Sequence, residues 1–200
     1  MKTQLIDLAK QRRSIYALGR NVTATPDDLT DLIKTNIKLA PTPFNNQTTR
    51  AVILFNQAHD QLWDIVHDEL RKVVKDDDAF AKTADKVNGF KAAFGTVLFF
   101  TDTAVVKQFE DNFPLYADNF RDWSEQAQGN AQFAVWTSLA ENGLGANIQH
   151  YNPLIDDQVR AAFDVPASWE LRAEMDFGSI EAPAGDKDFM ADADRFKVFK

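Results

Sequence analysis

Two short, continuous apolar runs constrain the fold of this chain more than any other feature. They span residues 51–55 and 95–101, carry no charge, and are rich in β-branched and aromatic side chains. Runs of this kind form strands that are covered on both faces. Helical patterns alternate with the strand patterns, and no repeat or linker divides the chain. The sequence therefore predicts one layered α/β or α+β domain spanning residues 1–200.

Helical periodicity fills most of the chain around these runs. A strong helix start, Thr25-Pro26-Asp27-Asp28, precedes apolar residues at helical spacing, and Pro41 ends that helix. An aromatic stripe at helical spacing indicates another helix that Pro114 interrupts, and such a stripe is more typical of a core or a subunit interface than of a cofactor site. The stripe consists of Phe109, Phe113, Tyr116, Phe120 and Trp123. Further helices are predicted over residues 2–12, 62–73, 124–142 and 156–163.

The remaining segments predict three more strands and one connection. Residues 146–150 indicate a short strand, and residues 171–177 alternate between apolar and polar side chains. Such alternation predicts a strand with one solvent-exposed face. Residues 195–200 also have the pattern of a strand. Residues 76–88 begin with three aspartates and indicate a solvated connection.

Charge and composition exclude several classes of function. The net charge is −8 and no basic block occurs, which argues against a nucleic-acid-binding protein. The chain has no cysteine, which excludes disulfides, thiolate metal sites and cysteine nucleophiles. No apolar run approaches the roughly 20 residues of a membrane span, and the first residues do not resemble a signal peptide. We therefore expect a cytoplasmic protein.

The common catalytic and cofactor motifs are missing from the chain. The three histidines, His59, His67 and His150, do not have the spacing of a metal site, so no metal is expected. Gly143-Leu144-Gly145 follows a helical pattern and does not complete a dinucleotide fingerprint. Neither a phosphate-binding P-loop nor a nucleophile elbow occurs. Any cofactor must be bound in another way.

Fixed cations stand near both ends of this acidic chain. They are Arg12, Arg13, Arg195 and Lys197, and a strand over residues 195–200 would place the last two on one side. Two turns rich in amide side chains, residues 42–47 and 147–150, lie between them. Cations suit a phosphate, and amides suit the hydrogen-bonding edge of a heterocycle. The combination points to a phosphate-bearing cofactor with a heterocyclic ring.

Two sequence motifs carry a resemblance to a known family. Arg12-Arg13-Ser14, followed by Pro41-Thr42-Pro43-Phe44-Asn45-Asn46-Gln47, resembles the nitroreductase family of FMN-dependent oxidoreductases. The Gly143-Leu144-Gly145 turn and the C-terminal basic pair follow in family order. The sequence most resembles the short members of the family found in bacteria and fungi. The resemblance implies an α+β fold of three α/β/α layers, with a mixed, mainly antiparallel sheet. It also implies an intertwined homodimer with two shared sites.

The resemblance assigns roles to individual residues. Arg12 and Ser14 would hold the FMN phosphate and ribityl chain with Arg13 alongside, and Arg195 and Lys197 would complete the phosphate site. The cofactor contacts from the other subunit would be Pro41, Thr42, Pro43 and Asn45, and Gln47 would either support that loop or touch the flavin. Gln149 and His150 would lie by the isoalloxazine, and Asn88 or Lys91 would contact its pyrimidine edge. Phe44, Phe113 and Tyr116 are candidates for the walls of the substrate pocket.

The implied activity is hydride transfer from NADH or NADPH, through flavin N5, to a nitroaromatic, a quinone or a similar acceptor by a ping-pong mechanism. The chemistry would take place on FMN, so no side chain is expected to be a covalent catalyst. One alternative is a flavin-binding stress-response or regulatory protein whose reductase activity is incidental. Another is a helical interaction protein without flavin, which docks through the aromatic stripe.

The chain departs from the family pattern in two places. Thr42-Pro43 replaces a pair of serines, which removes one hydroxyl and one backbone donor. Tyr16 stands where many relatives have a basic residue, so one cation fewer is expected near the phosphate.

Overall fold

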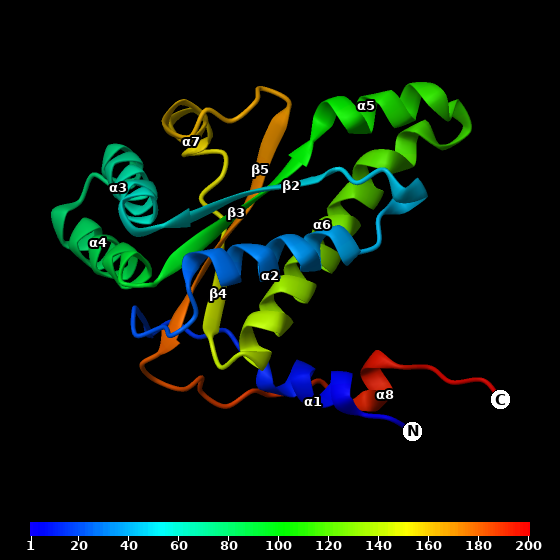
Figure 1. Cartoon of the computed structure of the whole chain (residues 1–200), viewed down its shortest axis with the longest axis horizontal. Coiled ribbons are helices and arrows are strands. Elements are labelled where there is room, and N and C mark those ends of the chain that lie inside the picture. The colour runs from blue at the N-terminus through cyan, green and yellow to red at the C-terminus, as the bar shows by residue number, and fades with distance from the viewer.

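A five-stranded antiparallel sheet forms the centre of the computed structural model, which describes residues 1–200 (Figure 1). The strand order is β1-β5-β3-β2, and β4 also pairs with β5. All pairings between these strands are antiparallel. The strands are β1 (Leu18–Gly19), β2 (Thr49–Phe55), β3 (Gly95–Asp102), β4 (Gly145–Gln149) and β5 (Trp169–Ile180).

The two apolar runs form strands, as predicted, and the structure shows that these strands are adjacent. The runs lie in β2 and β3, which pair in register from Thr49 opposite Thr101 to Phe55 opposite Gly95. Every residue of β3 is buried, since β3 lies between β2 and β5 and helices cover both of its faces. Neighbouring side chains of a strand point to opposite faces, so Val97 and Phe99 enter one core while Leu98 and Phe100 enter the other.

Helices cover both faces of the sheet and give the three predicted α/β/α layers. On one face lie α2 (Pro26–Leu39) and α6 (Ala117–Glu141), whose Ile33 and Val135 are buried against β3 and β5. On the other face, Trp63, Phe90 and Val159 are buried against β2, β3 and β5. These residues belong to α3 (Asn56–Val73), α4 (Asp77–Lys91) and α7 (Asp156–Ala162).

The remaining helices lie toward the ends of the layers. They are α1 (Gln4–Gln11), α5 (Thr103–Asn112) and α8 (Asp192–Arg195), with short 3₁₀ turns at Pro43–Asn45 and Pro114–Tyr116. None of the helices combines the length and apolar character that a bilayer span requires. Figure 1 shows both chain termini at the same end of the molecule, below the sheet.

Most helix boundaries follow the sequence signals. The predicted start of α2 is confirmed, because the Thr25 side chain accepts a hydrogen bond from the Asp28 N–H and the Asp28 carboxylate accepts one from Thr25. The predicted break at Pro114 is also confirmed: α5 ends before it and a 3₁₀ turn leads into α6. The long helix predicted from residue 124 starts earlier, at Ala117, because the second half of the aromatic stripe belongs to it.

The prediction of a solvated connection at residues 76–88 was wrong, because α4 occupies this segment. Asp76 caps the helix by accepting a hydrogen bond from the Ala79 N–H at 2.7 Å. The other two aspartates lie in the first turn, where negative charge is stabilised by the helix dipole. Val87 and Phe90 then pack into the core. The aspartates mark a helix start rather than a loop.

The prediction of one wet face for residues 171–177 was also wrong. Helices cover both faces of β5, so the polar face is buried and includes Glu174 and Asp176. The C-terminal strand predicted at residues 195–200 does not form either. Asp192–Arg195 is a short helix, and residues 196–200 have no regular structure, since no strand of this chain lies beside them to pair with.

Candidate functional site

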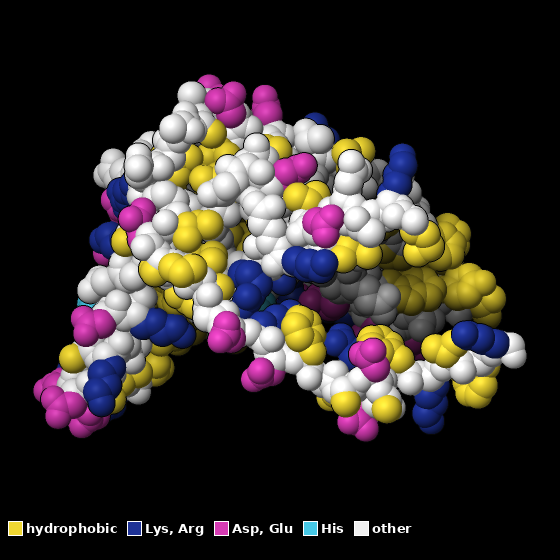
Figure 2. Space-filling model, turned by 90° about the horizontal axis from the view of Figure 1, so that it is seen from below, with side chains coloured by type: hydrophobic (Ala, Val, Ile, Leu, Met, Phe, Trp, Pro, Cys, Tyr) yellow, Lys and Arg dark blue, Asp and Glu magenta, His cyan; other side chains and the backbone are white.

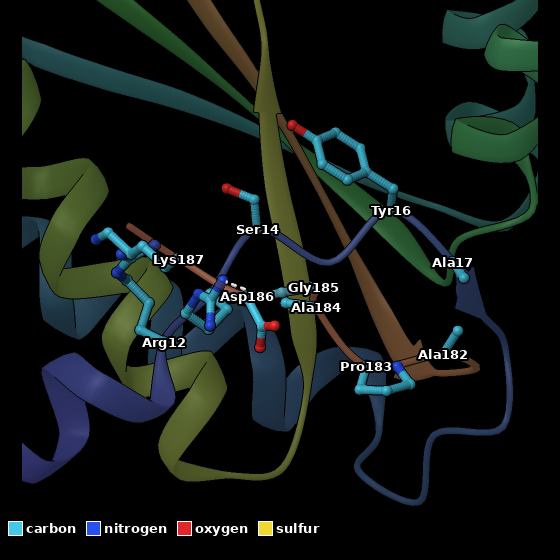
Figure 3. A pocket seen from close by; sticks show the side chains of 11 residues that line it. Arg12, Ser14, Tyr16, Ala17, Ala182, Pro183, Ala184, Gly185, Asp186 and Lys187 are labelled. Carbon is cyan, nitrogen blue, oxygen red and sulfur yellow. Dashed lines mark hydrogen bonds between the residues drawn. The ribbon is translucent and has the colours of Figure 1, made fainter. Parts of the chain in front are cut away.

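A cavity of about 460 Å³ lies between two segments from opposite ends of the chain (Figure 3). One wall is the segment after α1 and the other is the segment after β5. The lining residues are Arg12, Arg13, Ser14, Tyr16, Ala17, Ala182, Pro183, Ala184, Gly185, Asp186 and Lys187. We call this the Arg12 cavity. Figure 2 shows Lys and Arg side chains gathered in a hollow on the face seen from below.

The sheet fixes the first wall of the Arg12 cavity. The chain leaves α1 in an extended conformation at Arg12, and Ser14 then forms a parallel bridge with Ala146 of β4. The Ile15 N–H donates to the Ala146 carbonyl at 3.0 Å. A Cβ atom at Gly145 would stand 2.9 Å from the Ile15 Cβ, so only glycine allows this close approach. The wall is therefore held along its length by β4.

Three cations line the Arg12 cavity: Arg12, Arg13 and Lys187. Arg13 donates to the Gly185 carbonyl at 2.6 Å, which links the two walls. The Arg12 guanidinium lies over the Trp136 ring, 4.4 Å from its centre, and its Nε is buried without a hydrogen-bond partner. Burial, and then the charge of Arg13, lower the pKa of Arg12. An anion would relieve both the repulsion and the unsatisfied donor.

Ser14 and Tyr16 add hydroxyl groups to this cationic environment. In Figure 3 their side chains rise on one side of the segment, while Arg12 and Lys187 lie together at its other end. Asp186 is the one acidic residue of the lining. The arrangement suits a ligand with an anionic end and a polar chain.

The predicted basic pair does not lie in the Arg12 cavity, and a different lysine does. Arg195 and Lys197 are exposed on the C-terminal segment beyond Asp186, and the Arg195 guanidinium lies over the neighbouring Phe196 ring. In the single chain, Lys187 is the cation of the C-terminal segment that lines the cavity. Sequence reasoning missed Lys187 because its segment has no periodicity or motif.

The predicted loop over residues 41–47 lies beyond the C-terminal end of α2, away from the Arg12 cavity (Figure 1). Its Thr42 Oγ1 accepts a hydrogen bond from the Gln47 N–H at 3.1 Å, and Asn130 of α6 donates to the Pro41 carbonyl at 3.2 Å. Phe44, Asn45 and Gln47 all have positive φ angles, near 50°. Left-handed backbone is costly for residues other than glycine, so this short loop is strained.

The three candidate substrate-wall residues come together around the Phe44 ring. Phe113 and Tyr116 lie 5.0 and 5.8 Å from Phe44, measured between ring centres. Phe120 and Trp123 complete the cluster at 5.6 and 6.1 Å. A hollow of about 390 Å³ opens beside it, and we call it the aromatic hollow. Its lining is Pro41, Thr42, Pro43, Phe44, Trp123, Gln126, Ala127 and Asn130.

The remaining predicted contacts lie at the end of β4 and in α4. Gln149 donates from Nε2 to the Asn147 side-chain oxygen at 2.7 Å. His150 is exposed, and its Nδ1 lies 2.9 Å from the Arg172 carbonyl. Lys91 forms an ion pair with Asp64 at the end of α4. None of these side chains lines the Arg12 cavity, although Gln149 is the last residue of β4, the strand that supports it.

Two buried carboxyl groups lie behind β4, and the sequence reading missed them. Asp176 accepts a hydrogen bond from Asn147 at 3.0 Å, and Glu174 accepts one from the Tyr151 N–H at 2.9 Å. Burial raises the pKa of Glu174 to about 8 and the pKa of Asp176 well above its usual value. We call them the acid pair. The signal for them was present in the alternation of residues 171–177.

Comparison with known proteins shows that the chain is similar to nitroreductases. The family model described as "Nitroreductase family" matches residues 9–179. HBN1 of Saccharomyces cerevisiae is 35% identical over 181 residues, which cover 90% of this chain and 89% of HBN1. The structure of the nitroreductase CinD from Lactococcus lactis in complex with nicotinic acid is 54% identical. It covers 98% of this chain and all of CinD, with a TM-score of 0.92.

A more distant structure shares the fold alone. A nitroreductase-like protein from Desulfovibrio desulfuricans in complex with FMN is 17% identical over the whole of both chains, with a TM-score of 0.70. CinD has also been described in complex with chloramphenicol and with 4-nitrophenol.

The matched relatives are nitroreductases with this α+β fold, and in this chain a cavity lined by three cations lies beside the central sheet. The chain belongs to the nitroreductase family, since the family model covers most of it and HBN1 is related over nearly its whole length. The family is one of flavin-dependent oxidoreductases, as the resemblance implied.

Proposed function

We propose that the chain is an FMN-dependent reductase that takes electrons from NADH or NADPH and passes them to small aromatic acceptors such as nitroaromatics or quinones. The Arg12 cavity is the observation that carries the proposal. Three cations converge there in a chain of net charge −8, and the Arg12 Nε is buried without a partner. The FMN complex of the Desulfovibrio desulfuricans protein, which has the same fold, supports this choice of cofactor.

The residues present fit the phosphate end of FMN. Arg12 and Lys187 would bind phosphate oxygens, and Arg13 would add charge while it holds the second wall through Gly185. Ser14 would hydrogen-bond the phosphate or the ribityl chain. When bound, FMN would supply the redox chemistry, accepting a hydride and passing two electrons on. The side chains orient and bind, and none is proposed as a covalent catalyst.

The proposed active form is a homodimer. In a single chain, loop 41–47 and the Arg12 cavity lie apart, so a second copy is needed to bring Thr42, Asn45 and Gln47 to a shared site. The C-terminal segment exposes a series of large apolar side chains that a partner would cover: Phe189, Met190, Phe196, Val198 and Phe199. Docking of that segment would also be the event that brings Arg195 and Lys197 toward a phosphate.

The aromatic hollow is the proposed acceptor site. Phe44 and Trp123 offer ring faces, and Gln126 and Asn130 offer neutral amide groups. Planar aromatics with polar substituents fit this lining, because rings stack and amides hydrogen-bond a nitro or carbonyl oxygen. The complexes of CinD with 4-nitrophenol and chloramphenicol, both nitroaromatic compounds, support this acceptor class.

An absorption spectrum of the purified protein tests the proposal most directly. We expect a yellow protein whose flavin band bleaches on anaerobic addition of NADH or NADPH and returns when a quinone or a nitroaromatic is added. A colourless protein that shows no thermal shift with FMN would refute the cofactor. A yellow protein that is reduced but passes electrons to no acceptor would refute the reductase and favour a flavin-binding regulatory role.

A further inference from the structure

The acid pair, Glu174 and Asp176, lies on one face of β5, the strand that pairs with β4. Both residues are completely buried. They stand two positions apart, so both carboxyl groups point to the same side of the sheet. This is the face covered by α3, α4 and α7, where apolar side chains fill most of the space. Two carboxyl groups in such a place need a reason.

Hydrogen bonds connect the acid pair to both parts of the proposed cofactor site. Asn147 Nδ2 donates to Asp176 at 3.0 Å and also to the Ile15 carbonyl at 2.8 Å, inside the wall of the Arg12 cavity. The Asn147 side-chain oxygen accepts from Gln149 at 2.7 Å. Glu174 Oε2 accepts from the Tyr151 N–H at 2.9 Å, which holds the chain just after β4. The pair therefore anchors the wall and the following loop.

One oxygen of each carboxyl group has no partner. Glu174 Oε1 and Asp176 Oδ1 are buried and make no hydrogen bond in the protein. A carboxylate would leave negative charge on these atoms in an apolar environment, which is strongly unfavourable. A carboxylic acid leaves only a hydroxyl group there. The hydrogen bonds from the Tyr151 N–H and Asn147 favour a carboxylate, but complete burial outweighs them and favours the protonated form of both groups.

The surrounding ionisable groups do not offset this cost. Asp156 of α7 and Asp176 itself face Glu174, and both are acidic. Tyr151 is nearby, and burial followed by the charges of the acid pair raises the pKa of its hydroxyl to about 12. From α3, His59 bonds Thr96, the residue opposite Asp176, but burial lowers the pKa of His59 to about 4. It is therefore neutral near pH 7.

We propose that Glu174 and Asp176 are positioning residues that work as neutral acids, holding the Ile15 wall and the Tyr151 loop in register so that the cofactor site keeps its shape only while both carry a proton. Ionisation of either group would drive the carboxylate toward water. A carboxylate displaced toward water would no longer accept from the Tyr151 N–H or Asn147 in their present positions, and negative charge would appear behind an anion-binding cavity. Cofactor retention should therefore weaken at alkaline pH.

This inference rests on the proposed function, because it assumes that FMN binds in the Arg12 cavity. The test measures the dissociation constant of FMN by quenching of flavin fluorescence from pH 7 to pH 9. Wild-type protein is compared with Glu174→Gln, which keeps the acceptor oxygen but cannot ionise. Asp31→Asn is the matched control, because it also removes one carboxylate, from an exposed position on α2.

Wild-type protein and Asp31→Asn should bind FMN about tenfold more weakly at pH 9 than at pH 7, since a group with a pKa near 8 keeps about a tenth of its protons at pH 9. Glu174→Gln should lose less affinity than wild type over the same range, because Asp176 is then the one member of the pair that can still ionise. Parallel curves for wild type and Glu174→Gln would overturn the proposal, as would a Gln variant that has already lost affinity at pH 7.

An infrared measurement on the wild-type protein keeps the test independent of variants and of FMN. A protonated-carboxyl band should be present at pH 7 in protein without cofactor, decline as pH rises past 8, and shrink in Asp176→Asn. Absence of the band at pH 7 would overturn the proposal even if Glu174→Gln fails to fold. A protein that shows the band but binds no FMN would instead refute the proposed function.

Discussion

The Arg12 cavity and the aromatic hollow are two openings built in opposite ways. The Arg12 cavity gathers charge on a wall that β4 holds in place. The aromatic hollow has no charged residue in its lining and depends on a loop with three left-handed residues. Recognition of an anion needs hydrogen-bond donors in fixed positions, and the sheet holds the segment that carries Arg12 and Arg13. A hollow that accepts varied flat molecules needs apolar area and adaptable amides, which a strained loop and an aromatic cluster can supply.

The largest effect should come from removing the charge of the Arg12 cavity. Arg12→Ala combined with Lys187→Ala should weaken FMN binding by roughly 10²–10⁴-fold, because two charge-assisted hydrogen bonds contribute about 1.5–3 kcal/mol each. The control is Lys2→Ala with Lys200→Ala, which removes the same charge from the exposed chain ends. Fluorescence titration with FMN measures both. Equal affinities would show that the cavity is not the phosphate site.

The second prediction concerns the acid pair behind β4 and the effect of its protonation on the free energy of unfolding. Burial raises the pKa of Glu174 to about 8 in the folded protein, against the ordinary value of 4.5 for a glutamate in the unfolded chain. Between these values the folded state binds one proton more than the unfolded state, so raising the pH favours unfolding. The stabilisation is complete below pH 4.5 and lost as pH passes about 8.

Glu174→Gln removes this dependence. Relative to the variant, wild-type protein should lose about 1.4 kcal/mol of unfolding free energy per pH unit across the window. Urea unfolding at pH 5.5 and pH 7.5 measures the difference. Wild-type and variant midpoints that shift together would mean that Glu174 is ionised in the folded protein.

A mixing experiment tests whether the two openings meet across a dimer. Arg12→Ala damages the cavity, and Asn45→Ala damages the loop. If each site combines the cavity of one copy with the loop of the other, a mixed dimer has one intact and one doubly damaged site. Equal mixing of the unfolded variants and refolding should restore about a quarter of wild-type activity. Recovery no greater than the sum of the separate variants would place both residues in the same chain's site.

The smallest effect should appear at Phe44, because its ring packing stabilises the protein while its left-handed backbone destabilises it. Phe44→Ala removes the centre of the aromatic cluster and keeps the left-handed backbone, so the thermal midpoint should fall. Phe44→Gly removes the same ring but relieves the strain, and should be more stable than Phe44→Ala by about 1 kcal/mol. Both should raise the KM for a nitroaromatic acceptor. A glycine variant less stable than the alanine variant would show that the loop is not strained.

Local signals predicted those elements that depend on neighbours in the sequence. The Thr25 cap, the stop at Pro41 and the apolar run of β3 specify their structure locally, so they appear where predicted. The three aspartates at residues 76–78 were misread, because the same composition serves a loop and the first turn of a helix. The prediction of a solvent-exposed face for β5 failed because α3 and α4, which are distant in sequence, cover it together with α7.

The residues of the candidate site also divide into those that a local motif predicts and those that only tertiary packing brings together. Arg12, Arg13 and Ser14 form a compact motif, and they line one cavity. Lys187 belongs to a segment without periodicity, and only the packing of the chain after β5, where Arg13 donates to the Gly185 carbonyl, brings it to the same cavity as Arg12. The hydrogen bond from Tyr151 to Glu174 likewise joins residues that no local pattern relates. Predictions that require the chain ends to meet depend on tertiary structure.

The two walls of the Arg12 cavity come from residues 12–17 and 182–187, so nearly the whole chain must be synthesised before the cavity can exist. While the polypeptide is still on the ribosome, Arg12 and Arg13 have no opposing wall, and a phosphate meets only an open surface. A truncated product that ends before Ala182 would keep its β3 strand but present no enclosed anion site. Under the proposed function, FMN would therefore be retained only by polypeptides that extend at least to Lys187.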